Sequence, residues 1–328
     1  MNKEIFFYNI CGKLMPTGGI ADGKFMRTID VVNEINIQYN NKYKNKLTIT
    51  NNITSIKNSF IIFIKSDFTK NIEYIRKSKN NNNIIIVDIL DWLEVEDDIN
   101  NDNYDFPDLL INNIIDLIDV FICENEYVKN RYEKKYNKPC FIIKHHYDKR
   151  WHQLKKNDNS QEKLSIVFNG YMGHKNNNCL HINKLVENNI VTNNVKKYGQ
   201  YHLVLKAEEG LHNCHISIRD KDSWEYNIKP SIKIKTAAVL NCNIITTNDI
   251  SVKELLKKVD GTDYPYLLQS SEYNEVINMI KYAEKTYKTD IWYRGLEIMK
   301  KIKDNYDISI IVKDYYLPFF DFLFNKYC

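Results

Sequence analysis

The chain has 328 residues and is 43% hydrophobic, so it is long enough for two domains with ordinary buried cores. Its 46 basic and 42 acidic residues leave a net charge of +4, which argues against a nucleic-acid-binding protein because such proteins need a strongly basic face. No apolar run of about 20 residues is present, so we expect no membrane span.

Cysteine usage and composition indicate the compartment. None of the seven cysteines forms a CxxC pair or a zinc-ligand spacing, which predicts free thiols in a reducing environment. The first residues lack the apolar stretch of a secretory signal. Asn, Ile, Lys and Tyr are overused, as an AT-rich genome would produce. We therefore expect a cytoplasmic protein, in the host cytoplasm if the source is a virus.

In the first half of the chain, short runs rich in Ile, Val and Phe alternate with helical patterns. The predicted strands are residues 5–8, 59–64, 83–90, 120–123 and 140–143. The predicted helices are residues 26–37, 69–79, 108–118 and 126–136, the last capped by Asn125. Continuous apolar strands separated by helices are typical of a parallel sheet covered on both faces.

A second alternation follows residues 145–159, a polar stretch that we interpret as a linker containing His145 and His146. The predicted strands here are residues 164–168, 201–205, 215–218 and 243–246. The predicted helices are residues 231–240, 252–257, 271–286 and 289–305. The pattern therefore predicts an α/β fold with two successive βα domains that face a cleft.

We place these domains at residues 1–150 and residues 160–307. The remaining segment, residues 308–328, is strongly apolar, and an exposed patch of that kind is avoided by soluble proteins. We therefore expect residues 308–328 to pack on another part of the chain, with a membrane-surface helix and a dimer contact as the alternatives.

Residues 229–248 carry the most informative motif. Lys229, Pro230 and Lys233 lead into a helix of small residues, and a strand that ends in small polar residues follows. This segment resembles the donor-site segment of GT-B glycosyltransferases, and residues 263–266 (Asp-Tyr-Pro-Tyr) resemble a short stretch found downstream in some of these enzymes. The resemblance implies a hexosyltransferase-like enzyme that moves a sugar from a nucleotide-sugar donor to a glycan, protein or lipid acceptor. It also implies two Rossmann-like domains, with the C-terminal helix at residues 308–328 packing back on the first of them. Neither a metal ion nor a cofactor is expected to be required.

The physical logic of such a donor site is that a departing nucleoside diphosphate carries negative charge. Cations and a helix N-terminus can stabilise this charge without a metal. Ser231 stands where the predicted helix begins, between Lys229 and Lys233, and it can cap the helix or donate to a phosphate oxygen. An ordinary amphipathic helix with solvated lysines is the alternative interpretation. Further donor contacts are expected from Arg219, Glu225 and Thr236.

Loops at the carboxyl ends of other predicted strands should complete the site, because ligands of open parallel sheets bind there. The loop after residues 164–168 contains Gly170, His174 and Lys175, which we expect near the donor diphosphate unless it is a plain turn.

The loop after residues 5–8 is rich in glycine, and we expect Gly18 and Gly19 to line the cleft on the acceptor side. Arg27, just beyond this loop, either contacts a phosphate or is solvated, and we favour the solvated interpretation.

Four aspartates lie near the ends of predicted strands. Asp88 and Asp91 are candidate general bases for an acceptor hydroxyl, with a helix cap or a salt bridge as the alternative role. Asp220 and Asp222 form an Asp-x-Asp pattern that binds metal in another glycosyltransferase architecture, but the pattern is short and we expect no metal site.

The sequence departs from the GT-B pattern in one respect that bears on chemistry. Many retaining relatives have two glutamates eight positions apart, where this chain has Ile228 and Thr236. Neither side chain can act as a carboxylate, so the stereochemistry stays open. The alternatives to a transferase are a catalytically silent sugar- or nucleotide-binding protein on the same fold, or a nucleotide-sugar epimerase.

Overall fold

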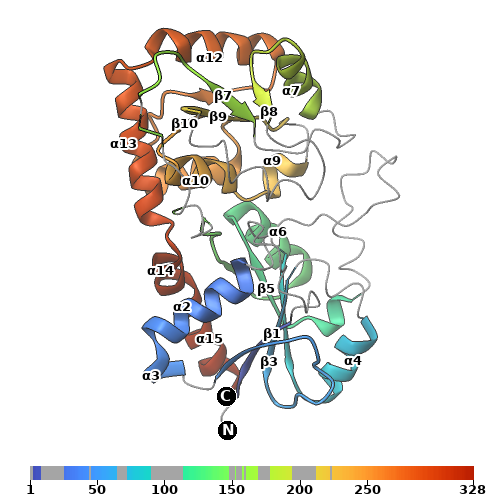
Figure 1. Ribbon diagram of the computed structural model, residues 1–328. Coiled ribbons are helices and arrows are strands. Elements are labelled where there is room, and N and C mark those ends of the chain that lie inside the picture. Colours follow the sequence, from blue (N-terminus) through green and yellow to red (C-terminus); the bar gives the residue numbers. More distant parts are fainter. Residues whose placement is uncertain are drawn as a thin grey trace.

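The computed structural model describes residues 3–8, 26–43, 46–64, 72–89, 114–147, 152, 157–158, 160–168, 178–193, 212–221 and 224–328. Within these residues the chain forms two sheets, and every strand pair in both is parallel (Figure 1). The prediction of an α/β fold with parallel sheets is confirmed.

The first sheet has six strands in the order β2-β1-β3-β4-β5-β6. They are β1 (Ile5–Tyr8), β2 (Leu47–Thr50), β3 (Phe60–Ile64), β4 (Ile84–Asp88), β5 (Val120–Cys123) and β6 (Cys140–Ile142). The helical elements of this half are the π-helix η1 (Met26–Asp30), α2 (Val31–Gln38), α3 (Asn40–Tyr43), α4 (Ile72–Asn80), the 3-10 turn η3 (Ile115–Leu117) and α6 (Glu126–Tyr136). All residues of β3 and β5 are buried, as continuous apolar runs require.

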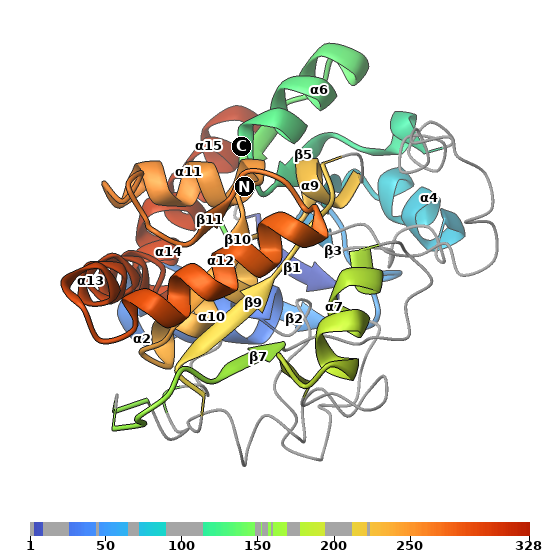
Figure 2. The same cartoon turned by 90° about the horizontal axis from the view of Figure 1, so that it is seen from above.

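The second sheet has five strands in the order β11-β10-β9-β7-β8. They are β7 (Ile166–Phe168), β8 (Thr192–Asn193), β9 (Cys214–Ser217), β10 (Asn243–Thr247) and β11 (Leu267–Leu268). The helices are α7 (Asn178–Glu187), α9 (Trp224–Ile228), α10 (Ile232–Val239), α11 (Ile250–Lys258), α12 (Tyr273–Thr286) and α13 (Asp290–Asn305). Figure 2, together with Figure 1, shows α12 on one side of this sheet and α10 on the other.

Both sheets reverse their strand order beside the first strand. The reversal lies between β1 and β3 in the first sheet and between β7 and β9 in the second. Such a switch point leaves a crevice at the carboxyl ends of the two strands, where α/β proteins bind ligands. The fold thus provides one candidate binding edge in each half of the chain.

The chain ends in a helical segment made of α14 (Ile308–Ile311), the π-helix η6 (Val312–Tyr316) and α15 (Leu317–Tyr327), which lies beside the first sheet (Figure 1). The Phe320 ring lies 6.5 Å from that of Phe7 and 5.8 Å from that of Tyr43, measured between centroids. The Phe324 ring lies 5.4 Å from that of Phe60. The two chain termini lie close together at this end of the molecule (Figures 1 and 2).

Several local predictions are met and others are wrong. Asn125 caps α6 as predicted, because its side chain accepts a hydrogen bond from the Val128 amide at 3.0 Å. The strands β2, β8 and β11 were not expected from the sequence. Residues 145–147, at the start of the stretch that we interpret as a polar linker, are buried. The predicted strand at residues 201–205 lies outside the described residues.

No helix in the described part of the chain combines the length and the apolar character needed to cross a bilayer.

Candidate functional site

Lys233 places a cation at the switch point of the second sheet. Its ammonium lies 4.4 Å from the ring centroid of Phe168, the last residue of β7. The neighbouring strand β9 carries His215, and burial lowers the pKa of His215 to about 3, with further contributions from the charges of His212 and Lys233. These two neighbours put the Lys233 ammonium next to the carboxyl end of β7, where an anion would be attracted.

Lys233 lies in the first turn of α10, and Ser231 is the residue before that helix. The Ser231 side chain makes no capping hydrogen bond, so the expected cap is absent. The first N–H groups of α10 are therefore not satisfied by this side chain, and a helix N-terminus of this kind favours a bound anion. Ser231 is buried and Lys229 is half-buried.

Arg219 follows β9 and faces the residues that precede α10. Its Nη1 lies 2.7 Å from an Asp249 carboxylate oxygen and donates to the Lys229 carbonyl at 3.1 Å. Its Nη2 donates to the Pro230 carbonyl at 2.8 Å. The guanidinium therefore donates its hydrogen bonds to protein groups around this turn. A direct contact with a donor stays a prediction.

The remaining donor candidates differ in how far the structure describes them. Thr236 is buried within α10. Glu225 belongs to α9, but its side chain lies outside the described residues. Gly170, His174 and Lys175 lie outside the described residues, as do Gly18, Gly19, Asp91 and Asp222.

Arg27 and Asp88 come together at the carboxyl end of the first sheet. The Nε of Arg27 lies 3.6 Å from an Asp88 oxygen, and its Nη2 lies 3.3 Å from a Glu124 oxygen and donates to the Ile143 carbonyl at 2.6 Å. The Arg27 side chain is 0% exposed, so our interpretation of Arg27 as a solvated residue is wrong. Two carboxylates and a carbonyl take the place of its hydration shell.

These contacts determine the charge of Arg27. Burial lowers its pKa, but the negative charge of Asp88, then the Tyr316 hydroxyl and Glu124, raise the pKa above its ordinary value. Arg27 is therefore charged, and Asp88 is its partner rather than an isolated base.

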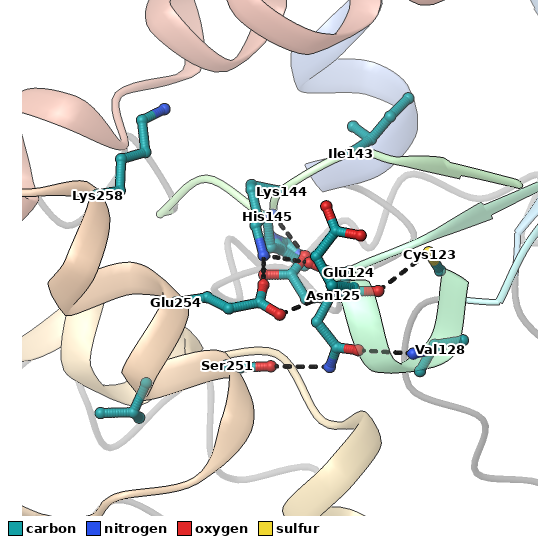
Figure 3. Close-up of polar contacts among 12 residues, drawn as sticks. Cys123, Glu124, Asn125, Val128, Ile143, Lys144, His145, Ser251, Glu254 and Lys258 are labelled. Carbon is teal, nitrogen blue, oxygen red and sulfur yellow. Dashed lines mark hydrogen bonds and ion pairs between the residues drawn. The ribbon is translucent and has the colours of Figure 1, made fainter. Parts of the chain in front are cut away.

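Glu124 forms the centre of a buried contact between the two halves of the chain (Figure 3). Its Oε1 lies 3.4 Å from the Lys235 ammonium of α10, and its Oε2 accepts from the His145 amide at 2.7 Å. Lys235 also donates to the His145 carbonyl at 2.6 Å. Lys235 belongs to the same helix as Lys233, so these contacts join α10 directly to the first half of the chain.

A second set of contacts extends this link. Lys144 donates to the Glu124 carbonyl at 2.6 Å and pairs with Glu254 of α11. The side-chain amide of Asn125 donates to the Asn227 carbonyl at 2.8 Å. It also donates to the Ser251 hydroxyl at 3.2 Å (Figure 3). We call the residues in these contacts the junction; they are Glu124, Asn125, Lys144, His145, Asn227, Lys235, Ser251 and Glu254.

Our sequence analysis missed Glu124 and Lys235. A signal for Glu124 was present, because it directly follows a buried strand in the same way as Asp88 ends one. Lys235 has no comparable signal, because a lysine within an amphipathic helix usually faces water. Among the described residues, no group of three or more His, Cys, Asp or Glu side chains is arranged to hold a metal ion.

No protein-family model matches the sequence, and no curated protein matches it. Solved structures do match over the whole chain. A glycosyltransferase from Rickettsia africae ESF-5 has a TM-score of 0.61 at 10% identity, with 99% of this chain and 100% of that chain covered. The chain has the GT-B fold.

Two further structures show the same GT-B arrangement. Sucrose-phosphate synthase from Thermosynechococcus elongatus has a TM-score of 0.60 at 9% identity, with 98% of this chain and 99% of that chain covered. HepE from Anabaena in complex with UDP has a TM-score of 0.59 at 10% identity, with 97% and 100% covered. At these identities the shared property is the GT-B fold.

Proposed function

We propose that this GT-B chain is a glycosyltransferase that moves a sugar from a nucleotide-sugar donor, and that the donor diphosphate binds at the start of α10. The observation that carries the proposal is the Lys233 ammonium, which lies 4.4 Å from Phe168 at the switch point of the second sheet. The uncapped start of α10 is beside it. Chains with the same fold support the proposal, since HepE was solved with UDP and with UDP and glucose.

The chemistry requires stabilisation of the departing diphosphate. Lys233 supplies a full positive charge, and the first amides of α10 supply the positive end of a helix dipole. Both are preorganised before the donor binds, so little reorganisation is needed as negative charge develops. This arrangement needs no divalent metal, and we propose metal-independent transfer.

For the acceptor, we propose a glycan, a protein or a lipid. Asp88 and Asp91 remain the candidates for the general base. Asp88 is buried and paired with Arg27, so an acceptor hydroxyl must displace part of that contact to reach it. Asp91 is the alternative three residues further on.

A catalytically silent binding protein is the second candidate function. The observation that favours it is that Thr236 and Ile228 occupy the positions of the two glutamates found in many retaining enzymes. Thr236 is buried and has no carboxylate. Binding of a nucleotide sugar without any turnover would support this candidate.

Calorimetric titration with UDP, GDP, ADP and TDP tests the proposed donor site. We expect one of them to bind, and Lys233→Met to weaken it by roughly tenfold to hundredfold, because a charge-assisted hydrogen bond contributes about 1.5–3 kcal/mol. Met keeps an unbranched side chain of similar length and removes the charge. Lys300→Met, on the exposed face of α13, is the matched control and should bind as the unaltered protein does. Equal affinity of the Lys233 variant and the control would contradict the proposed site.

A further inference from the structure

One guanidinium holds the turn that leads into α10. Arg219 donates to the carbonyls of two successive residues, Lys229 at 3.1 Å and Pro230 at 2.8 Å. Its amide donates to the Thr247 hydroxyl of β10 at 3.0 Å, which fixes the backbone of Arg219 to the neighbouring strand. The two peptide planes before Ser231 therefore have a fixed orientation relative to the edge of the second sheet.

Asp249 holds this guanidinium in place. One of its oxygens lies 2.7 Å from Arg219 Nη1, and the other accepts from the Val252 amide at 2.9 Å as the cap of α11. Both residues are largely buried, at 9% exposure for Arg219 and 1% for Asp249. Burial raises the pKa of Asp249, and Arg219 opposes that rise. Asp249 is thus anchored to α11, and Arg219 is anchored to Asp249.

The planar fork of an arginine fixes geometry as well as charge. Here each hydrogen bond goes to an oxygen of the protein, and Nη1 is shared between Asp249 and the Lys229 carbonyl. A phosphate bound directly by Nη1 would have to displace one of these acceptors. The observed contacts therefore fit a residue that orients the turn at residues 229–231 better than one that binds phosphate directly.

We propose that Arg219 and Asp249 are a positioning pair, which holds the turn at residues 229–231 so that the start of α10 and Lys233 face an anionic nucleoside diphosphate. This role rests on the proposed function. It differs from the direct phosphate contact expected for Arg219 from the sequence, and it assigns a role to Asp249.

The two roles predict opposite results for Asp249→Asn. Asparagine is as good a helix cap as aspartate, so α11 keeps its start. If Arg219 touched phosphate, removal of its carboxylate partner would leave affinity equal or higher. If the pair positions the turn, Asp249→Asn should weaken binding as Arg219→Lys does, because either change removes the charged fork contact.

The test is calorimetry with whichever of UDP, GDP, ADP and TDP binds the unaltered protein most tightly. We expect Arg219→Lys and Asp249→Asn each to weaken binding by about tenfold, and the double variant by little more than either, because the two residues act as one unit. In a Lys233→Met background each change should cost less than it does in the unaltered protein, because part of its effect passes through Lys233. A purely structural role would not produce this dependence on Lys233.

Asp307→Asn provides the matched control, since Asp307 caps α14 far along the chain from this turn. It should keep full affinity, and circular dichroism should show that every variant is folded. Unchanged or tighter binding by Asp249→Asn overturns the positioning role, as does an effect that persists undiminished in the Lys233→Met background. If the unaltered protein binds none of the four nucleotides, the proposed function fails, and the role of the pair toward a nucleotide fails with it.

Discussion

At the scale of single residues, the junction depends on one carboxylate that neutralises more than one cation. Glu124 is 1% exposed and pairs with Arg27 and Lys235, which are both 0% exposed. Burial lowers the pKa of Lys235 to about 8, and the attraction of Glu124 offsets this only in part. The cost of removing a partner should therefore differ between the cation and the anion.

We predict that Glu124→Gln lowers the free energy of unfolding by about 3–5 kcal/mol, because it leaves buried positive charge without its counterion. Lys235→Met should cost clearly less, because Arg27 still pairs with Glu124 and no ammonium has to be desolvated. The double variant should be more stable than Glu124→Gln alone. Urea unfolding measures all three, and an equal loss in the two single variants would contradict this account.

The burial of His215 leads to a separate prediction about how stability depends on pH. Its pKa is about 3 in the folded chain, against an ordinary value of 6.5. Below pH 6.5 the unfolded chain takes up a proton that the folded chain does not, so stability falls as the pH is lowered from 6.5 toward 3. His145 is also buried with a lowered pKa and acts in the same direction.

We therefore expect His215→Gln to lose less stability than the unaltered protein between about pH 7 and pH 5, measured by urea unfolding. The slope contributed by one such histidine approaches about 1.4 kcal/mol per pH unit. An unaltered slope in the His215 variant would show that this group does not carry the effect.

At the scale of elements, the C-terminal segment is held to the first sheet by aromatic contacts. Phe320 is 0% exposed and packs on Phe7 and Tyr43. Phe319 and Phe322 both pack against Phe141 of β6, at centroid distances of 5.1 and 4.5 Å. These rings cover a face of the first sheet that would otherwise meet water.

We predict that Phe320→Ala lowers the free energy of unfolding by about 3–5 kcal/mol, because it leaves a cavity among buried rings. Deletion of residues 315–328 should give insoluble or poorly packed protein, for the same reason over a larger area. Asp321→Asn is the control, since its ion pair with Lys42 is exposed and should contribute less than about 1 kcal/mol. A soluble, cooperatively folding truncation would contradict this role of the segment.

Elements with a strong local signal were predictable from the sequence, and others were not. The short, β-branched apolar runs of β3, β4 and β5 are typical of buried strands, and the structure has strands there. The strand β2 was missed because Leu47–Thr50 alternates apolar and polar residues over only four positions after a Lys- and Asn-rich stretch. Its place is decided by pairing with β1, some forty residues earlier in the chain.

The candidate site was also predictable from the sequence only in part. The motif around Lys233 was visible because its residues are adjacent in sequence. The burial of Arg27 was not, because its partners Asp88 and Glu124 lie at the carboxyl ends of two different strands. The Arg219–Asp249 pair likewise joins residues thirty positions apart. A single sequence carries little information on which distant charges meet.

At the scale of the whole molecule, the GT-B fold contains two sheets, each with its own switch point. Two sets of contacts described above join the two halves of the chain. One link is the junction, in which Lys235 of α10 reaches Glu124. The other is the C-terminal segment, which returns from the second half to the first sheet. The candidate donor helix α10 is therefore connected to the half that we expect to hold the acceptor. This connection is consistent with transfer of a sugar from the donor to the acceptor.

The most direct test of the central claim is incubation of the purified protein with UDP-, GDP-, ADP- and TDP-linked sugars in the presence of EDTA, with products identified by mass spectrometry. The account predicts release of a nucleoside diphosphate and free sugar from one donor by slow hydrolysis, at a rate that EDTA leaves unchanged. Lys233→Met should reduce this rate at least about tenfold. Absence of release from every donor, conversion of a donor to an isomer, or activity that EDTA abolishes and manganese restores would contradict the account.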